Sequence, residues 1–150
     1  MVINNVHTDG SCLGNPGKGG WAVYFEELDV KLSGNSIYTT NNRMELEAIA
    51  KALSYVKDNC LEGKVIIHSD SAYAINALTS GNVRRWSKKG WKLANGKQVK
   101  NVDIWDRILY LIDKVESLYC TIEFMKVKGH SGEEFNELVD EMARKEAQDA

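Results

Sequence analysis

The spacing of apolar residues changes near residue 40, and this change limits the folds that the chain can adopt. Residues 2–9, 19–28 and 30–38 are short stretches with aromatic and β-branched residues, which predicts three strands in direct succession. From residue 44 to residue 56 an apolar residue recurs at every fourth position, which predicts a helix with one apolar face. Adjacent strands indicate an antiparallel meander, and the helix then carries the chain away from it.

The rest of the chain alternates between helix and strand patterns. Strands are predicted at residues 64–70 and 121–127, and helices at residues 71–79, 102–115 and 134–147. Because strands separated by helices pair in parallel, the expected fold class is α/β, with a five-stranded mixed sheet flanked by helices. Three of its strands would be antiparallel and two parallel. Gly34 and Asn35 predict an irregularity or turn in the third strand, and Thr40 or Asn41 is expected to cap the first helix.

Length and composition favour one domain that spans residues 1–150. No apolar run is long enough to span a bilayer, and the first residues lack the basic start and apolar middle of a signal peptide. Cys12, Cys60 and Cys120 lie far apart and form no CxxC pair, which favours reduced thiols over disulfides or a zinc site. We therefore expect a cytoplasmic protein without membrane contact. A monomer is expected because the sequence shows no unusual apolar stripe.

The charged residues are distributed unevenly along the chain. The net charge is −2, but residues 84–100, called here the basic segment, contain seven basic residues and no acidic one. The remainder carries 12 basic and 21 acidic residues. Trp86 and Trp91 alternate with the cations, a combination that suits phosphates and the flat faces of bases or sugars. The alternative is a helix with its tryptophans in the core and its lysines solvated. For Trp105, which follows the segment within the apolar pattern of the predicted helix 102–115, we favour the core.

Four carboxylates are candidates for a metal site. Asp9 and Asp70 each close a predicted strand, and in α/β sheets binding sites gather at the carboxyl ends of strands. Their oxygens suit hard cations such as Mg²⁺ or Mn²⁺, although each aspartate could instead cap the turn or helix that follows it. Glu45 lies early in its helix, where a surface charge is also favourable, and Asp140 is a poor helix former within a helix. Spacing alone does not group the four, because they come from separate segments.

The segment from Gly10 to Gly20 holds five of the chain's 12 glycines. It matches neither the P-loop pattern nor GxGxxG at the start of a helix, so nucleotide binding of those kinds is not expected. Three interpretations stay open: a phosphate cradle, a tight connection between antiparallel strands, and a flat backbone surface that lets a large polymer approach Asp9.

Taken in order, these pieces resemble bacterial type 1 ribonuclease H over nearly the whole chain. The motifs that carry the resemblance are TDGSCLGNPG (8–17), TTNNRMELEA (39–48), SDSAY (69–73), WSKKGWK (86–92), VKNVDIW (99–105), KGHSG (128–132) and NELVDEMA (136–143). Several long motifs in the right order are a specific signal, unlike any single carboxylate. The fold that the family implies is the ribonuclease H-like fold, with a central five-stranded mixed sheet.

The resemblance also implies an activity, the hydrolysis of the RNA strand of an RNA–DNA hybrid. The family's four catalytic carboxylates match Asp9, Glu45, Asp70 and Asp140, which would hold two divalent ions, Mg²⁺ or alternatively Mn²⁺, about 4 Å apart. Its loop histidine matches His130, which would assist water activation or product departure. The expected products carry 5′-phosphate and 3′-hydroxyl ends.

Further matches imply how the hybrid is bound. Cys12, Asn15, Asn41 and Asn42 match contacts near the RNA sugars, whose 2′-hydroxyls distinguish RNA from DNA. Thr40, together with Asn15, matches a pocket for a phosphate of the DNA strand. The basic segment matches the family's basic protrusion, and its expected contacts are Arg84, Arg85, Trp86, Lys88, Lys89, Trp91 and Lys92.

The chain departs from the family at two places, and other functions stay open. Ala72 stands where some relatives carry an amide side chain able to contact the RNA, and residues 79–84 differ in length and lack an aromatic residue. The alternatives are a non-catalytic hybrid-binding protein, a nuclease for DNA junctions or duplex DNA, and, more remotely, a binder of small nucleotides. All four carboxylates are present, which argues against the first, since a protein that only binds would sooner replace negative charge facing phosphates.

Overall fold

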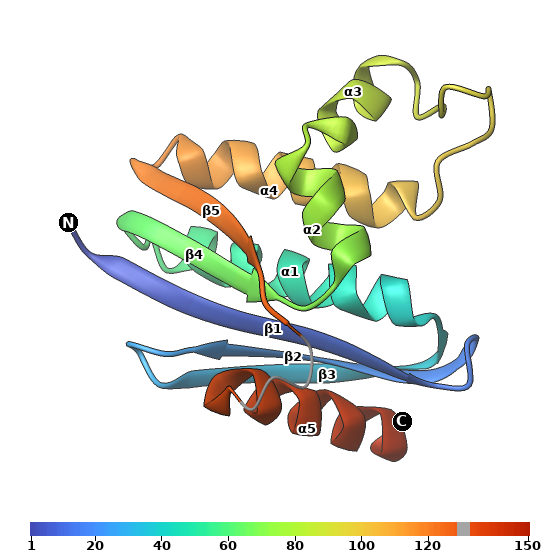
Figure 1. The fold of residues 1–150 in the computed structure, drawn as a ribbon. Helices are drawn as coiled ribbons and strands as arrows, with labels where there is room; N and C mark the ends of the chain where they lie inside the picture. The colour runs from blue at the N-terminus through green and yellow to red at the C-terminus, as the bar shows by residue number, and fades with distance from the viewer. Residues whose placement is uncertain (129–132) are drawn as a thin grey trace.

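The computed structural model describes residues 1–128 and 133–150, which form a mixed sheet covered by helices (Figure 1). The strands are β1 (Ile3–Leu13), β2 (Gly17–Phe25), β3 (Val30–Thr39), β4 (Gly63–Ser69) and β5 (Cys120–Lys126). The first three are antiparallel, whereas β4 pairs in parallel with β1 and β5 in parallel with β4. The order across the sheet is β3-β2-β1-β4-β5. The predicted fold class is confirmed.

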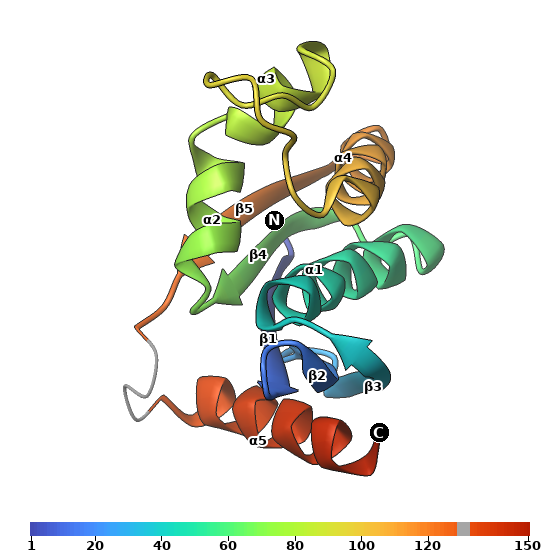
Figure 2. The ribbon, with the colours of Figure 1, turned by 90° about the vertical axis from the view of Figure 1, so that its right-hand side faces the viewer.

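Helices cover both faces of the sheet. They are α1 (Asn41–Asp58), α2 (Ala72–Thr79), α3 (Asn82–Lys88), α4 (Val102–Glu116) and α5 (Glu134–Asp149). Helices α1 and α4 pack together on one face, and α5 lies across β1 and β2 on the other (Figures 1 and 2). Helix α3, at the start of the basic segment, was not predicted, because its seven residues are too few to show a helical period.

The main core lies between the sheet and the layer of α1 and α4. Trp105 of α4, Phe25 of β2 and Leu53 of α1 are fully buried there, which confirms the assignment of Trp105 to the core. Each such side chain stabilises the fold by about 1.5 to 3 kcal/mol. A smaller apolar cluster that includes Tyr24 and Val139 holds α5 against the opposite face. Helices α1 and α5 therefore pack on opposite faces of β1, the central strand of the sheet.

Strand β1 continues past Asp9, contrary to the prediction that Asp9 closes the first strand. The parallel pairing of β1 with β4 stops at His7, whereas its antiparallel pairing with β2 continues to Leu13, opposite Lys18. The sequence pattern missed this because Gly10, which has low strand propensity, directly follows Asp9 and interrupts the strand pattern. Asp9 consequently lies just beyond the last residue of β1 that pairs with β4.

The glycine-rich segment is mostly strand, and two of its glycines let helices approach the sheet. A methyl group on Gly10 would lie 2.4 Å from the backbone of Glu45 in α1, and one on Gly20 would lie 2.3 Å from the carbonyl oxygen of Ala143 in α5. Such contacts do not fit a side chain. Within this segment positive φ occurs only at Gly14, in the tight turn between β1 and β2. The interpretation as a strand connection holds for that turn, and the close helix packing was not foreseen.

Gly34 and Asn35 do not interrupt β3, contrary to the prediction. Both residues pair with β2, and a methyl group on Gly34 would lie 2.6 Å from the indole ring of Trp21. Glycine at this position therefore makes room for an aromatic ring on the neighbouring strand. The irregularity in this pair of strands lies between Gly17 and Gly19 instead.

Candidate active site

Three carboxylates from three segments meet beyond the end of the β1–β4 pairing. Asp9 belongs to β1, Glu45 to α1, and Asp70 is the first residue after β4. Each offers an oxygen atom, and the three oxygens lie within 4.8 Å of one another. The pairing of β4 with β1 brings Asp70 beside Asp9, and the close approach of α1 to Gly10 brings Glu45 over both.

Neither helix next to this cluster is capped by one of its carboxylates. Ser71 caps α2 by accepting a hydrogen bond from the first turn at 3.1 Å, so the capping alternative is wrong for Asp70. Thr40 caps α1 in the same way at 3.2 Å, as one of the two predicted caps. Asp9 lies within a strand and accepts a hydrogen bond from the next amide at 2.9 Å. The free oxygens of the cluster therefore remain available for a ligand.

The cluster is buried and electrostatically crowded. Asp9 is 3% exposed and Glu45 is 5% exposed. Burial, together with the nearby charge of Asp70, raises the pKa of Asp9 to about 7. Burial and the charges of Asp9 and Asp70 raise the pKa of Glu45 well above its usual range. Both groups thus resist ionisation in the metal-free protein.

One oxygen of the cluster has no hydrogen-bond partner. Among the described residues, Oε1 of Glu45 is buried and accepts no hydrogen bond. An unpaired buried carboxylate oxygen is costly unless a cation or donor approaches it. Carboxylate oxygens are the preferred ligands of Mg²⁺ and Mn²⁺, so these residues fit a hard divalent cation.

Asp140 faces the same hollow but is not part of the compact group. The hollow measures about 520 Å³, and its lining includes the three clustered carboxylates, Asp140 and Arg144. One turn farther along α5, Arg144 pairs with Oδ2 of Asp140 at 3.1 Å. Arg144 was not among the predicted site residues, although its spacing of four residues from Asp140 is the signal that would have indicated it.

The other predicted site residues lie around the hollow or outside the described part of the chain. Asn41 and Asn42 are exposed and line it, as does Ala72. The side-chain oxygen of Asn15, in the β1–β2 turn, accepts a hydrogen bond from the Asn41 amide at 3.0 Å. Sγ of Cys12 lies 3.0 to 3.6 Å from three carbonyl oxygens in and beside the same hairpin. His130 falls outside the described residues.

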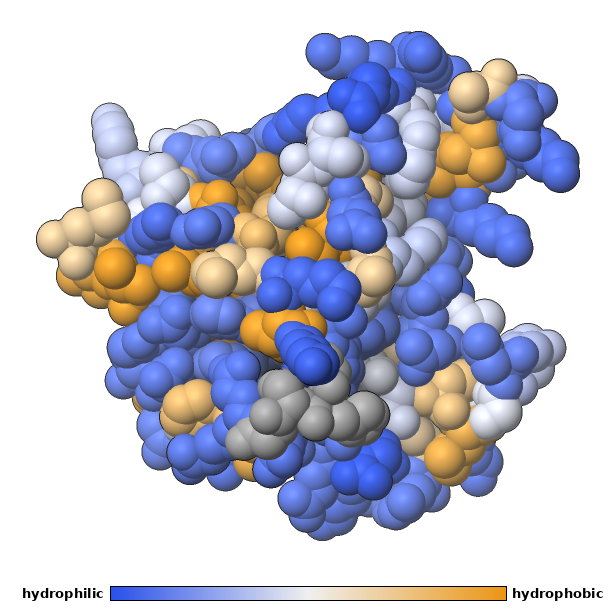
Figure 3. All heavy atoms as spheres, in the orientation of Figure 1, coloured by the Kyte–Doolittle hydropathy of each residue, from blue (hydrophilic) through white to orange (hydrophobic). Residues whose placement is uncertain are grey.

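The basic segment projects beyond α2 and α4 and carries mainly hydrophilic side chains (Figures 1 and 3). Arg84 pairs with Asp113 of α4 at 2.7 Å. No ion pair between described residues involves the segment's five lysines, Lys88, Lys89, Lys92, Lys97 and Lys100. Trp86 and Trp91 are half-buried and pack against the main core, so the core alternative holds for part of each ring. The segment is thus a cationic surface on an apolar base.

Comparison with known proteins gives the family. A family model described as RNase H matches residues 3–148. The chain belongs to the ribonuclease H family. Ribonuclease H of Prosthecochloris aestuarii is 47% identical over 141 residues, which are 93% of this chain and 91% of that protein. Ribonuclease H of Chlorobaculum parvum is 44% identical over the same shares of the two chains.

Solved structures agree with this assignment. LC9-RNase H1, described as a type 1 RNase H with the type 2 active-site motif, superposes with a TM-score of 0.81 at 26% identity over 98% of this chain and 72% of that chain. The resemblance to type 1 ribonuclease H is confirmed. A foamy viral protease-reverse transcriptase in complex with RNA/DNA hybrid has a TM-score of 0.75 at 18% identity, over 98% of this chain and 20% of that one, and shows the fold alone. Among the helices of residues 1–128 and 133–150, none has the length and apolar character needed to cross a membrane.

Proposed function

We propose that this member of the ribonuclease H family is an endonuclease that hydrolyses the RNA strand of RNA–DNA hybrids, with divalent metal ions held by Asp9, Glu45, Asp70 and Asp140. The observation that carries the proposal is the buried, unpartnered oxygen of Glu45 within a cluster of carboxylates. Such a cluster destabilises the metal-free protein, and a bound cation removes both the repulsion and the missing contact. Metal binding therefore explains why the chain keeps these groups together.

The proposed reaction is attack of water on a phosphodiester with departure of the 3′ oxygen, which leaves 5′-phosphate and 3′-hydroxyl ends. Two ions, Mg²⁺ or Mn²⁺, would supply Lewis-acid chemistry to the attacking water and the leaving oxygen when bound. Asp9 and Glu45, which are buried on a strand and a helix, present their oxygens in fixed positions. Asp140 reaches the hollow from α5 and completes the four ligands. His130 keeps the role that its motif implies, assistance to water activation or product departure.

Selection of the hybrid is assigned to residues around the hollow. Asn41 and Asn42 are exposed and carry amides, which can both donate to and accept from a ribose 2′-hydroxyl. Cys12 is proposed to lie near the same sugars. Asn15 and Thr40 flank the start of α1 and are proposed to hold a phosphate of the DNA strand. The lysines of the basic segment would contact phosphates farther along the duplex.

A protein of this fold that only bound hybrids is the second candidate. It would gain nothing from a buried carboxylate cluster, because negative charge facing a phosphate weakens binding. Burial of ionised Asp9 and the unpartnered oxygen of Glu45 both cost stability, and a bound cation offsets both costs. The structure therefore favours catalysis over binding alone.

Cleavage of an end-labelled RNA–DNA hybrid tests the proposal. The wild-type chain, Asp9→Asn and the matched control Asp106→Asn, an exposed carboxylate on α4, would be compared in Mg²⁺, Mn²⁺ and EDTA. We expect cleavage of the RNA strand by the wild type and the control, and none by Asp9→Asn or in EDTA. Duplex DNA and duplex RNA should stay intact.

Two results would contradict the proposal. A folded wild type that binds the hybrid but does not cleave it with either metal would favour the binding protein. Equal cleavage of hybrid and duplex DNA would favour a nuclease that does not read the 2′-hydroxyl.

A further inference from the structure

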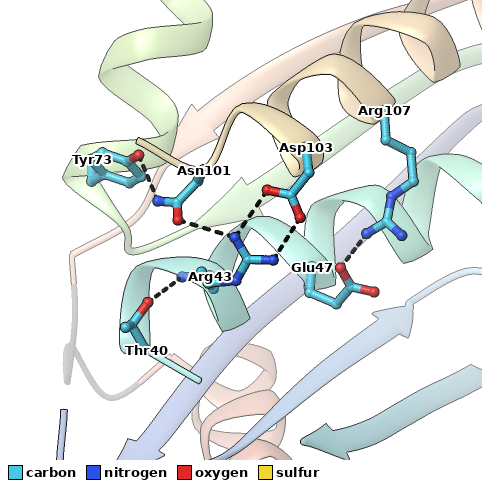
Figure 4. Close-up of polar contacts among 7 residues, drawn as sticks. All are labelled: Thr40, Arg43, Glu47, Tyr73, Asn101, Asp103 and Arg107. Carbon is cyan, nitrogen blue, oxygen red and sulfur yellow. Dashed lines mark hydrogen bonds and ion pairs between the residues drawn. The ribbon is translucent and has the colours of Figure 1, made fainter. Parts of the chain in front are cut away.

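Arg43 lies beside the proposed hybrid contacts and the metal ligand Glu45, yet its side chain turns away toward α4 (Figure 4). Its guanidinium donates to both carboxylate oxygens of Asp103, at 3.0 and 2.7 Å, and to the side-chain oxygen of Asn101 at 3.3 Å. A planar guanidinium bound at two nitrogens in this way has one orientation. Arg43 therefore connects the first turn of α1 rigidly to the start of α4.

Asn101 is the residue through which the basic segment passes into α4. Its φ is 62°, in the left-handed region that asparagine tolerates better than most residues. The side-chain nitrogen donates to the hydroxyl of Tyr73 at 3.0 Å, while the side-chain oxygen accepts from Arg43. Both the oxygen and the nitrogen of the Asn101 amide are therefore hydrogen-bonded. These two bonds fix the direction in which the chain passes from the basic segment into α4.

Tyr73 connects this junction to the acidic hollow. It lines the hollow, and its hydroxyl also accepts a hydrogen bond from the indole nitrogen of Trp105 at 3.3 Å. The ring of Trp105 meets the ring of Trp86, near the beginning of the basic segment, edge to face with centroids 6.2 Å apart. At the other end of the segment Val99 is buried in the main core. One end of the segment thus contacts the hollow through Trp86, Trp105 and Tyr73. The other end packs through Val99 into the main core, to which α1 also contributes.

We propose that Arg43 is a positioning residue that holds the basic segment at one angle to the acidic hollow, so that a single hybrid contacts both surfaces. The inference rests on the proposed function. When the contacts of Arg43 are lost, the segment samples several angles, and a hybrid bound to its lysines reaches the hollow in only some of them. Loss of Arg43 should change the free energy of unfolding only slightly, because an exposed ion pair stabilises a fold only weakly.

A different role for Arg43 would be direct attraction of a phosphate. The two roles predict opposite results for Asp103→Ala. If Arg43 acts as a phosphate ligand, removal of the neighbouring negative charge frees it and strengthens hybrid binding. If Arg43 acts through the junction, removal of Asp103 loosens the guanidinium and weakens productive binding, as Arg43→Met does.

Arg107 supplies a matched control. It pairs with Glu47 and so joins the same two helices, α1 and α4, but takes no part in the hydrogen bonds of Asn101 and Tyr73 (Figure 4). Arg43→Met and Arg107→Met remove the same charge and the same number of side-chain atoms. A difference between them therefore reports the junction and not the loss of one ion pair between helices.

The first measurement is amide hydrogen exchange of residues 91–101 in the free protein. We expect exchange in this region to be about fivefold faster in Arg43→Met than in Arg107→Met, which corresponds to a modest coupling between the two parts. Equal exchange in the two variants would overturn the proposal whether or not the chain is a nuclease.

The second measurement is a double-mutant cycle on hybrid cleavage. Arg43→Met should raise KM by about fivefold and leave kcat unchanged, and this effect should vanish when Lys88 and Lys89 are replaced by glutamine. An effect on KM that persists without those lysines, or tighter binding by Asp103→Ala, would overturn the proposal. A wild type that neither binds nor cleaves hybrids would overturn the proposed function instead, and the exchange measurement would still decide the role of Arg43.

Discussion

Replacement of Asp9 by asparagine should stabilise the metal-free protein, although it removes a proposed metal ligand. Asp9 is 3% exposed and faces the carboxylates of Glu45 and Asp70. Asparagine has nearly the same shape and carries no charge, so the substitution removes both the cost of burying a charge and the repulsion between carboxylates.

The pKa of Asp9 sets the size of this effect. It rises from 3.8 to about 7 on folding, so the folded chain binds this proton more tightly than the unfolded chain does. The resulting stabilisation is fully present below pH 3.8 and is lost as the pH rises through about 7. Because each pKa unit corresponds to about 1.4 kcal/mol, Asp9→Asn should be more stable than the wild type at pH 8 by about 4 kcal/mol. At pH 5 the difference should be less than half as large.

Thermal unfolding followed by circular dichroism in EDTA measures this difference. For a chain of this length it corresponds to a rise in Tm of roughly 10 °C at pH 8. The control Asp106→Asn, at an exposed position of α4, should leave Tm nearly unchanged. Added Mg²⁺ should raise the Tm of the wild type more than that of Asp9→Asn, since it stabilises only the form that binds it.

Two outcomes would refute this reasoning. One is a variant no more stable than the wild type in EDTA at pH 8. The other is an advantage that is as large at pH 5 as at pH 8, because it would show that the ionisation of Asp9 is not the cause.

Three further predictions follow from single contacts. Gly20→Ala should lower the free energy of unfolding by about 3 kcal/mol, because its methyl group would meet the backbone of α5, and urea unfolding measures this loss. Arg144→Gln should tighten Mg²⁺ binding severalfold in a calorimetric titration, since Arg144 competes for Asp140, whereas Lys145→Gln should not; equal shifts in both variants would show a general charge effect. Trp86→Ala should reduce stability by about 3 kcal/mol, since its ring packs against the core, and an unchanged Tm would contradict that packing.

Much of the secondary structure could be predicted because its signals are local. The four-residue recurrence of apolar side chains indicated α1, and the stretches of aromatic and β-branched residues indicated the meander. Two errors came from glycine. Gly34 was predicted to interrupt β3, but it pairs with Trp21 and makes room for its ring. Because of Gly10, directly after Asp9, the first strand was predicted to end at residue 9, but Gly10 also pairs with Trp21, within β1 and β2. Glycine permits both a turn and close packing, so its neighbours in space decide which one it serves.

For the candidate site, too, the sequence determined some features and the tertiary structure decided others. The sequence by itself supplied the carboxylates, the basic segment and the motifs that resemble ribonuclease H. Residue spacing did not group the carboxylates, and the family resemblance implied their shared role without their geometry. Only the tertiary structure decided how closely Asp9, Glu45 and Asp70 converge, that one oxygen of Glu45 lacks a partner, and that Arg43 turns toward Asn101. Periodicity and propensity depend on residues close together in the chain. Burial, pKa shifts and contacts between segments depend on distances that exist only once the strands have paired and the helices have packed.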